Sequence, residues 1–249
     1  MNIVVCVKRV PDTETRVRVA QDGTDIDPSG VKFVVSPYDE FALEAALRAK
    51  EAGVDATVTA LSLGDAATAE TLRQALAMGA DQAVLLEGAA GADGLAVAKA
   101  LAAELEGRQD ELVLFGIKAI DDDQQQVGPM VGTLLGRPCA TSVSSFEVDG
   151  AVVRCRREVE GGTETVELPL PAVVSMTKGP HEPRYPSLKG IMAAKKKPLE
   201  QKAVEVAPPR LTVASMTLPP ERPAGRIVGE GPDAVPELVR LLRDEAKVL

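Results

Sequence analysis

The stretch that decides the fold reads Leu112-Val113-Leu114-Phe115-Gly116-Ile117-Lys118-Ala119-Ile120-Asp121-Asp122-Asp123-Gln124-Gln125-Gln126-Val127-Gly128. Its first four residues form a short apolar run of the kind found in a buried strand, and Gly116 ends that run. A polar turn follows, and then the start of a helix whose first backbone N–H groups have no partner within the helix. A strand that leads through a polar turn into a helix is the basic unit of an α/β fold.

The chain before this stretch repeats the same alternation. Short apolar runs predict further strands at residues 3–7, 56–63 and 82–86. Helical spacing of apolar residues predicts helices at 37–53, 65–79 and 93–107, each of which ends at a glycine. We therefore expect a mostly parallel sheet with right-handed crossovers and helices on both faces.

Antiparallel additions to this sheet are expected in two places. Residues 16–19 alternate between basic and apolar side chains and then meet Gln21-Asp22-Gly23, a hairpin signal. Beyond residue 140, Asp149-Gly150 and Gly161-Gly162 separate β-prone runs at 141–148, 152–159 and 163–168. The sequence therefore predicts a small excursion near Gly23 and hairpins after residue 140.

The composition of the chain changes after Lys195. Residues 196–231 are rich in proline and charge and show no sustained periodicity, which predicts an extended arm. The arm ends in a helix whose apolar stripe consists of Val235, Leu238, Val239, Leu242, Ala246 and Leu249. The predicted organisation is an α/β domain over residues 1–195 and an arm over residues 196–249.

Composition and charge exclude several classes of protein. The net charge of −9 argues against nucleic-acid binding, which needs a clustered excess of Lys and Arg. Cys6, Cys139 and Cys155 have no C-x-x-C spacing, so neither a zinc ribbon nor a complete disulfide framework is expected. The opening apolar run is too short for a signal peptide, and no run approaches the length of a membrane span. We expect a cytoplasmic protein without membrane insertion.

The turn between Gly116 and Gly128 is the first candidate site. In an open α/β sheet, ligands bind beyond the carboxyl ends of the strands, and a helix start there can receive a phosphate. Asp121, Asp122 and Asp123 would repel an anion unless they point away from it or bind sugar hydroxyls. On spacing alone, these residues are also explained as a solvated turn that caps a helix. No metal site is expected, because adjacent carboxylates diverge and no outlying His or Glu completes a coordination sphere.

Two further segments are candidates. Ser36 is placed as an N-cap with Pro37 in the first helical position, and capping alone accounts for both, although this rim faces the same crevice as Cys6 and Leu63. Prolines at 180, 183 and 186 predict an exposed loop over residues 176–192. Within it, Leu188 either anchors a partner or folds back onto the core.

Five segments in this order and spacing resemble electron transfer flavoprotein beta subunits over roughly residues 1 to 200. They are Val7-Lys8-Arg9-Val10-Pro11-Asp12, then Pro37 with Glu40, then Ala75-Leu76-Ala77-Met78-Gly79-Ala80-Asp81, then Ala119-Ile120-Asp121-Asp122-Asp123, and finally Glu182-Pro183-Arg184-Tyr185 with Ile191-Met192-Ala193-Ala194-Lys195-Lys196-Lys197. The resemblance implies a Rossmann-like, adenine-nucleotide-binding fold in a heterodimer with an alpha subunit, on which the terminal helix docks. It also implies AMP in this subunit and an FAD at the interface, held mainly by the alpha subunit.

The resemblance also implies a role for particular residues. Contacts to AMP would come from Cys6, Ser36, Pro37, Tyr38, Asp39, Leu63, Gly116, Ile117, Lys118, Ala119, Ile120, Asp121, Asp122, Asp123, Gln124, Gln125, Gln126 and Val127. Docking to acyl-CoA dehydrogenases would use Arg184, Tyr185, Pro186, Ser187, Leu188, Lys189, Gly190, Ile191, Met192 and Ala193, with Leu188 as the apolar anchor. The chain would then carry electrons from such dehydrogenases to a membrane quinone oxidoreductase, and would not be an enzyme by itself.

The candidate nucleotide turn departs from the family pattern in two ways. The AMP-type pattern ends in Asn-Gln-Thr-Gly, whereas this chain has Gln125-Gln126-Val127-Gly128 and so lacks the Thr hydroxyl. The ending Val-Gly-Pro through Pro129 resembles electron-bifurcating members with a second FAD, but Asp122 and Gln124 depart from that pattern. AMP is the preferred ligand and the second FAD stays open. An adenine-nucleotide-using enzyme and a stand-alone nucleotide sensor are further alternatives, and the missing G-x-x-x-x-G-K-[ST] loop argues against the enzyme.

Overall fold

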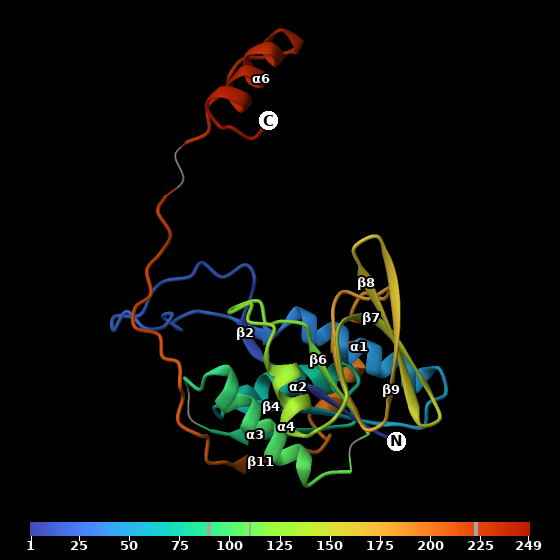
Figure 1. Cartoon of the computed structure of the whole chain (residues 1–249). Coiled ribbons are helices and arrows are strands. Elements are labelled where there is room, and N and C mark those ends of the chain that lie inside the picture. Colours follow the sequence, from blue (N-terminus) through green and yellow to red (C-terminus); the bar gives the residue numbers. More distant parts are fainter. Residues whose placement is uncertain (89–90, 110, 222–223) are drawn as a thin grey trace.

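The computed structural model describes residues 1–88, 91–109, 111–221 and 224–249. Within these ranges the main sheet has nine strands in the order β11-β5-β4-β1-β6-β10-β7-β8-β9 (Figure 1). Five parallel strands form its middle: β5 (Gln82–Glu87), β4 (Thr57–Gly64), β1 (Asn2–Cys6), β6 (Leu112–Gly116) and β10 (Ala172–Met176). These strands are apolar and buried on both faces, as parallel strands between two helical layers are.

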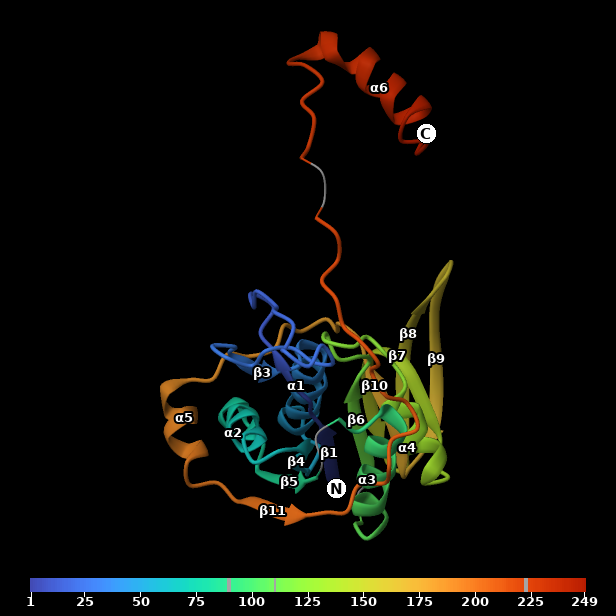
Figure 2. The ribbon, with the colours of Figure 1, turned by 90° about the vertical axis from the view of Figure 1, so that its left-hand side faces the viewer.

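Helices cover both faces of the sheet, which confirms the predicted fold class. Helices α1 (Pro37–Glu51) and α2 (Thr68–Met78) share a hydrophobic core with Ile3 and Val5 of β1. Helix α3 (Gly94–Glu106) and helix α4 (Val127–Leu134) lie on the other face, where α3 and Val131 of α4 share a second core with Val4 and Cys6 (Figure 2). Successive residues of β1 therefore serve opposite cores, because side chains alternate along a strand.

The antiparallel additions after residue 140 are also confirmed. Strands β7 (Cys139–Asp149), β8 (Val152–Val159) and β9 (Gly162–Pro169) form a meander that continues the sheet beyond β10. The excursion near Gly23 differs from the expected hairpin. Its paired strands are β2 (Arg9–Pro11) and β3 (Phe33–Val35), at the two ends of the excursion, and only a single bridge, Val19 with Ile26, joins the chain next to Gly23.

Three elements were not expected from the sequence. Strand β10 had no predicted counterpart, although all five of its residues are buried. Helix α5 (Leu188–Ala194) replaces the second part of the predicted proline-rich loop, because the last of its prolines is Pro186 and Ser187 caps the helix that follows. Strand β11 (Leu199–Ala203) pairs in parallel with β5 inside the stretch predicted to be an arm without regular structure.

The arm is fastened to the domain well beyond β11. The N–H of Val204 donates to the Glu87 carbonyl at 2.9 Å, and the Asp93 carboxylate accepts from the N–H groups of Arg210 and Leu211 at 2.7 and 3.0 Å. Further along, the N–H of Met216 donates to the Gly23 carbonyl at 2.6 Å. The chain then leaves the domain, and η1 (Pro232–Ala234) and α6 (Val235–Asp244) stand apart from it in both views (Figures 1 and 2).

None of the helices in the described ranges combines the length and the apolar character needed to cross a membrane.

Candidate functional site

A crevice opens where the carboxyl ends of β1, β4 and β6 meet. Its walls come from the ends of these three strands, from the start of α3, and from the polar turn that leads into α4. The residues that line it are Cys6, Val7, Lys8, Asp39, Leu61, Ser62, Leu63, Ala92, Gly94, Val97, Leu101, Phe115, Gly116, Ile117, Lys118, Ala119, Asp122, Gln124, Gln125, Gln126, Val127 and Gly128. It lies at the edge where open α/β sheets bind ligands.

The crevice brings together most of the residues predicted to contact a nucleotide. Those that line it are Cys6, Asp39, Leu63, Gly116, Ile117, Lys118, Ala119, Asp122, Gln124, Gln125, Gln126 and Val127, whereas Ser36, Pro37, Tyr38, Ile120, Asp121 and Asp123 are not among its lining residues. Sequence reasoning missed Lys8 and Gly94. Lys8 could have been found because it follows the carboxyl end of β1 by two residues, beside the end of β6 at Gly116.

The three aspartates of the turn are paired with lysines. The Lys8 ammonium lies 2.9 Å from a carboxylate oxygen of Asp121 and 2.8 Å from one of Asp122, and the Lys118 ammonium lies 2.9 Å from the carboxylate of Asp123. Burial alone would lower the pKa of Lys8, but the hydrogen bonds and charges of Asp122 and Asp121 raise it. The negative charge of the turn is therefore largely compensated, which lessens its repulsion of an anion.

The turn itself has an unusual backbone. Asp123 and Gln125 have φ angles of 53° and 54°, in the left-handed region that few residues other than glycine adopt. The Gln126 side chain donates to that of Gln124, and a side chain at Gly94 would collide with it. Helix α4 begins directly after Gln126, so the N–H groups of Val127 and Gly128 have no carbonyl partner within the helix. They are donors at the mouth of the crevice.

Asp39 holds two sides of the crevice together. Its side chain is buried, and its two oxygens accept hydrogen bonds from the N–H of Lys8 at 2.8 Å and from the N–H of Gly116 at 2.9 Å. Burial raises the pKa of the Asp39 carboxyl to about 7, although these two N–H groups act in the opposite direction. Gly116 has to be a glycine here, because a Cβ would lie 2.7 Å from both Asp39 N and Tyr38 C.

The predicted role of Ser36 needs a correction. Ser36 is the N-cap residue of α1, with Pro37 in the first turn as expected, but its side chain makes no capping hydrogen bond. Its hydroxyl is fully buried and has no hydrogen-bond partner among the described residues. The helix start is completed by the Ser36 carbonyl, which accepts from the N–H groups of Asp39 and Glu40.

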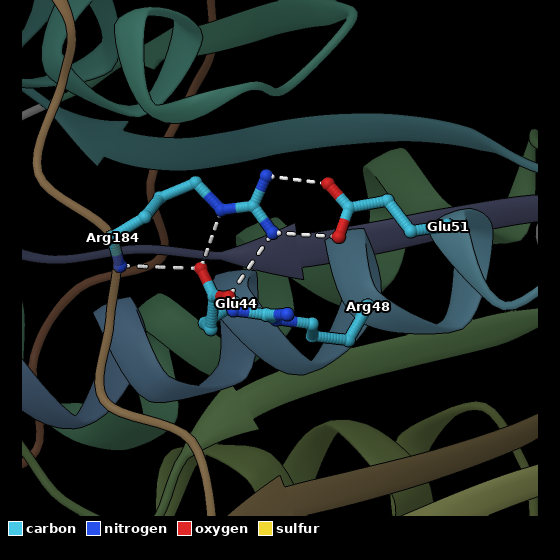
Figure 3. A network of polar contacts seen from close by, with 4 residues as sticks. All are labelled: Glu44, Arg48, Glu51 and Arg184. Carbon is cyan, nitrogen blue, oxygen red and sulfur yellow. Dashed lines mark hydrogen bonds and ion pairs between the residues drawn. The ribbon is translucent and has the colours of Figure 1, made fainter.

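The predicted docking segment is anchored at its first residue. The Arg184 guanidinium donates to the carboxylates of Glu44 and Glu51, with shortest distances of 2.7 and 2.6 Å, and Arg48 also donates to Glu44 (Figure 3). Glu44 is only 1% exposed. Burial alone would raise the pKa of Glu44, but the hydrogen bonds from Arg184 and Arg48 hold it below its ordinary value.

Helix α5 of this segment is capped at its start and tied to α2 at its end. The Ser187 hydroxyl accepts from the N–H of Gly190 at 3.0 Å and so caps the helix start. At the other end, Arg73 of α2 donates to the carbonyls of Ala194 and Lys197, and the Lys197 ammonium donates to the carbonyls of Leu76 and Ala80. Side chains of α2 and of the residues just after α5 therefore satisfy carbonyl groups at the end of the other helix.

The outer surface of this segment is apolar. Leu188 is 82% exposed and Met192 71% exposed, and they lie one turn apart on α5, while Tyr185 just before the helix is 95% exposed. Leu188 therefore does not fold back onto the core. These side chains form an exposed apolar surface on and just before α5.

Comparison with known proteins identifies the class of this chain and then its family. Residues 24–207 match the family model described as the electron transfer flavoprotein domain. The chain is 43% identical to the electron transfer flavoprotein subunit beta of Bradyrhizobium diazoefficiens, over all of both chains. It is 39% identical to that of Bacillus subtilis, over all of both chains, and 39% identical to that of Homo sapiens, over 98% of each. The chain belongs to the family of electron transfer flavoprotein beta subunits, and its role is in electron transport as part of a flavoprotein.

Proposed function

We propose that this chain is the AMP-binding subunit of a heterodimeric electron transfer flavoprotein. It pairs with an alpha subunit, which holds most of the redox FAD, and it carries electrons without catalysing a reaction by itself. The observation that supports this most directly is the crevice at the ends of β1, β4 and β6, whose mouth combines free helix N–H donors with charge-compensated aspartates. We place the protein in the cytoplasm.

The chemistry of the crevice fits a nucleotide monophosphate. Backbone N–H groups of Val127 and Gly128 are suited to a phosphate, and the apolar floor formed by Leu61, Leu63 and Val97 is suited to a base. Pro129 has no N–H, so the start of α4 offers fewer donors than an ordinary helix. In this proposal AMP fills the crevice and supplies no redox chemistry.

A second FAD in this subunit is the alternative that the sequence favours through Val127, Gly128 and Pro129. Asp122 argues against it. This side chain lines the crevice and bonds the Lys8 ammonium at 2.8 Å, so a larger pyrophosphate ligand would have to displace a paired charge. AMP would require less rearrangement of the Asp122–Lys8 ion pair than FAD, and it is therefore the ligand we propose.

The deciding experiment is mass spectrometry of the nucleotides that the complex releases. The chain is co-expressed with an alpha subunit from the same source, purified as the heterodimer, desalted and denatured. We expect one AMP and one FAD for each heterodimer, and a colourless chain when it is expressed alone. Two FAD molecules and no AMP would support the bifurcating alternative, whereas failure to form any flavin-containing complex would contradict the proposal.

We also propose that residues 184–193 dock acyl-CoA dehydrogenases, before the electrons pass to a membrane quinone oxidoreductase. The support is the exposed apolar surface of Leu188, Met192 and Tyr185 on a segment held by ion pairs. Leu188→Ala should slow electron transfer from such a dehydrogenase about tenfold, the loss expected for an interface anchor, and leave both nucleotides bound. Val159→Ala, which removes an exposed apolar side chain on β8, is the matched control. Equal rates for the two variants would contradict this docking role.

A further inference from the structure

The Asp39 carboxylate stands between two elements that meet at the crevice. Asp39 lies in the first turn of α1. One of its oxygens accepts from the N–H of Lys8, two residues beyond β1, and the other accepts from the N–H of Gly116, the last residue of β6. Strands β1 and β6 are parallel neighbours, so one buried side chain ties together the points at which both strands leave the sheet.

The same carboxylate acts on both ends of the first half of the polar turn, from Gly116 to Asp122. Gly116 is the first residue of the turn and is bound directly. Near the other end, Asp121 and Asp122 are bound by the Lys8 ammonium, and the backbone of Lys8 is in turn bound by Asp39. The chain from Gly116 to Asp122 is thus closed into a loop through Asp39 and Lys8.

The close packing at Gly116 indicates that this arrangement is tight. A Cβ on Gly116 would overlap the Asp39 side chain and would lie 2.7 Å from its backbone N. The Asp39 residue is 6% exposed, and both of its oxygens are occupied by backbone N–H groups. Both oxygens of this carboxylate therefore already act on the protein backbone.

We propose that Asp39 is a positioning residue for the nucleotide crevice, which shapes the turn from Gly116 to Asp122 through Gly116 and Lys8 instead of contacting the nucleotide with its carboxylate. This inference rests on the proposed nucleotide site and adds to it the residue that sets its shape. It also makes nucleotide affinity depend on the ionisation of Asp39, because a neutral carboxyl is a weaker acceptor of two N–H groups.

The charged groups that face Asp39 are few. Lys8 favours its ionised form and Asp121 opposes it, and burial has the largest influence and holds the pKa at about 7. The ionised form therefore predominates only above neutral pH. We expect the affinity of the crevice for AMP to rise between pH 6 and pH 8 as Asp39 ionises.

The test uses the heterodimer, stripped of AMP, with AMP binding measured by calorimetry between about pH 6 and pH 8.5. Asp39→Asn should weaken binding roughly tenfold or more at pH 8, because an amide offers one acceptor where two N–H groups need one each. Its affinity should vary less with pH than that of the wild type, because only the ionisation of the AMP phosphate, with a second pKa of about 6, then remains. Glu40→Gln, which neutralises the neighbouring half-buried carboxylate of α1, is the matched control and should bind as the wild type does.

A second variant, Lys8→Met, separates positioning from direct contact with the ligand. If Asp39 shapes the turn through Lys8, the two substitutions disrupt the same contact. The variant that carries both Asp39→Asn and Lys8→Met should then bind AMP little worse than Asp39→Asn alone. Fully additive losses, or an Asp39→Asn variant with wild-type affinity, would overturn the inference. Should Asp39→Asn fail to assemble, the wild type is titrated with adenosine, which has no phosphate to ionise, and a flat pH profile for adenosine would also overturn the inference. A wild-type complex that binds no adenine nucleotide would instead contradict the proposed site itself.

Discussion

Gly116 shows how little room the crevice leaves for a side chain. Gly116→Ala places a Cβ 2.7 Å from Asp39 N and Tyr38 C, and backbone atoms cannot move aside as a flexible side chain can. We expect the free energy of unfolding to fall by about 2 to 3 kcal/mol and AMP to be lost from the heterodimer. Urea denaturation of the isolated chain measures the first effect, and nucleotide analysis of the complex measures the second.

A matched control exists in β9. Gly162 has no atoms within 4 Å of an added Cβ, so Gly162→Ala should change the unfolding free energy by less than about 0.5 kcal/mol. If Gly116→Ala changed the unfolding free energy as little as Gly162→Ala, α1 would not approach the end of β6 as closely as the structure has it.

Asp39 should also make the unfolding free energy of the chain depend on pH. Its ordinary pKa is 3.8 and its pKa in the folded chain is about 7, so between these values the folded state binds more protons than the unfolded state. The unfolding free energy contributed by Asp39 therefore falls as the pH rises through this window and levels off above it. Relative to Asp39→Asn, the wild type should lose about 2 to 3 kcal/mol between pH 5 and pH 8.

Urea titrations of the wild type and of Asp39→Asn at several pH values measure the difference between their unfolding free energies. Its sign is opposite to the pH dependence expected for AMP binding, which should strengthen as Asp39 ionises. A difference in unfolding free energy that stayed constant with pH would mean that Asp39 is not buried as the structure has it. Glu40→Gln again controls for the removal of a carboxylate from the same helix turn.

Among single elements, the ion pairs of Arg184 with Glu44 and Glu51 hold the chain just before α5 against α1. Arg184→Met removes two hydrogen bonds from Glu44, which is 1% exposed and, among the residues that the structure describes, keeps Arg48 as its ion-pair partner. We expect a loss of about 2 kcal/mol, less than for a fully orphaned buried charge, and faster amide exchange in residues 181–187. Denaturation and hydrogen exchange measure the two effects.

Glu51→Gln is the control for this variant. The Glu51 side chain is 52% exposed, so losing its pairing with the same guanidinium should cost under about 1 kcal/mol and leave amide exchange unchanged. Equal effects of Arg184→Met and Glu51→Gln would show that the buried half of the network, through Glu44, does not hold the segment.

Elements with a strong local pattern could be predicted, and those that depend on distant partners could not. The apolar runs of β1, β4, β5 and β6 reflect burial on both faces and were predicted within a residue or two. Strand β11 reads Leu199-Glu200-Gln201-Lys202-Ala203 and is mostly exposed, so only its pairing with β5 makes it a strand. The contacts of Asp39 could not be predicted either, because its partners lie 31 and 77 positions away and no local pattern indicates that its side chain is buried.

At the scale of the whole molecule, the last thirty or so residues are separate from the domain. The N–H of Met216 still donates to the Gly23 carbonyl, and Leu218 then lines a hollow together with residues of the 12–32 excursion. Helix α6 stands apart from the domain (Figure 1). None of its residues is buried, although Val235 and Leu238 belong to an apolar stripe. The apolar side of this amphipathic helix is not covered by its own domain. We propose that the alpha subunit covers it.

Truncation after Leu218 tests this division of the chain. Because α6 makes no buried contact with the domain, the truncated chain should unfold at the same temperature as the full chain, within about 2 °C. It should nevertheless fail to form the heterodimer, as judged by co-purification with the alpha subunit. The point variants Leu238→Asp and Arg240→Gln refine the test, since the first places a charge on the apolar stripe and the second changes the polar side of the same helix. Only Leu238→Asp should impair assembly. A large loss of thermal stability in the isolated truncated chain would instead mean that α6 packs on its own domain, as a stand-alone nucleotide sensor would require.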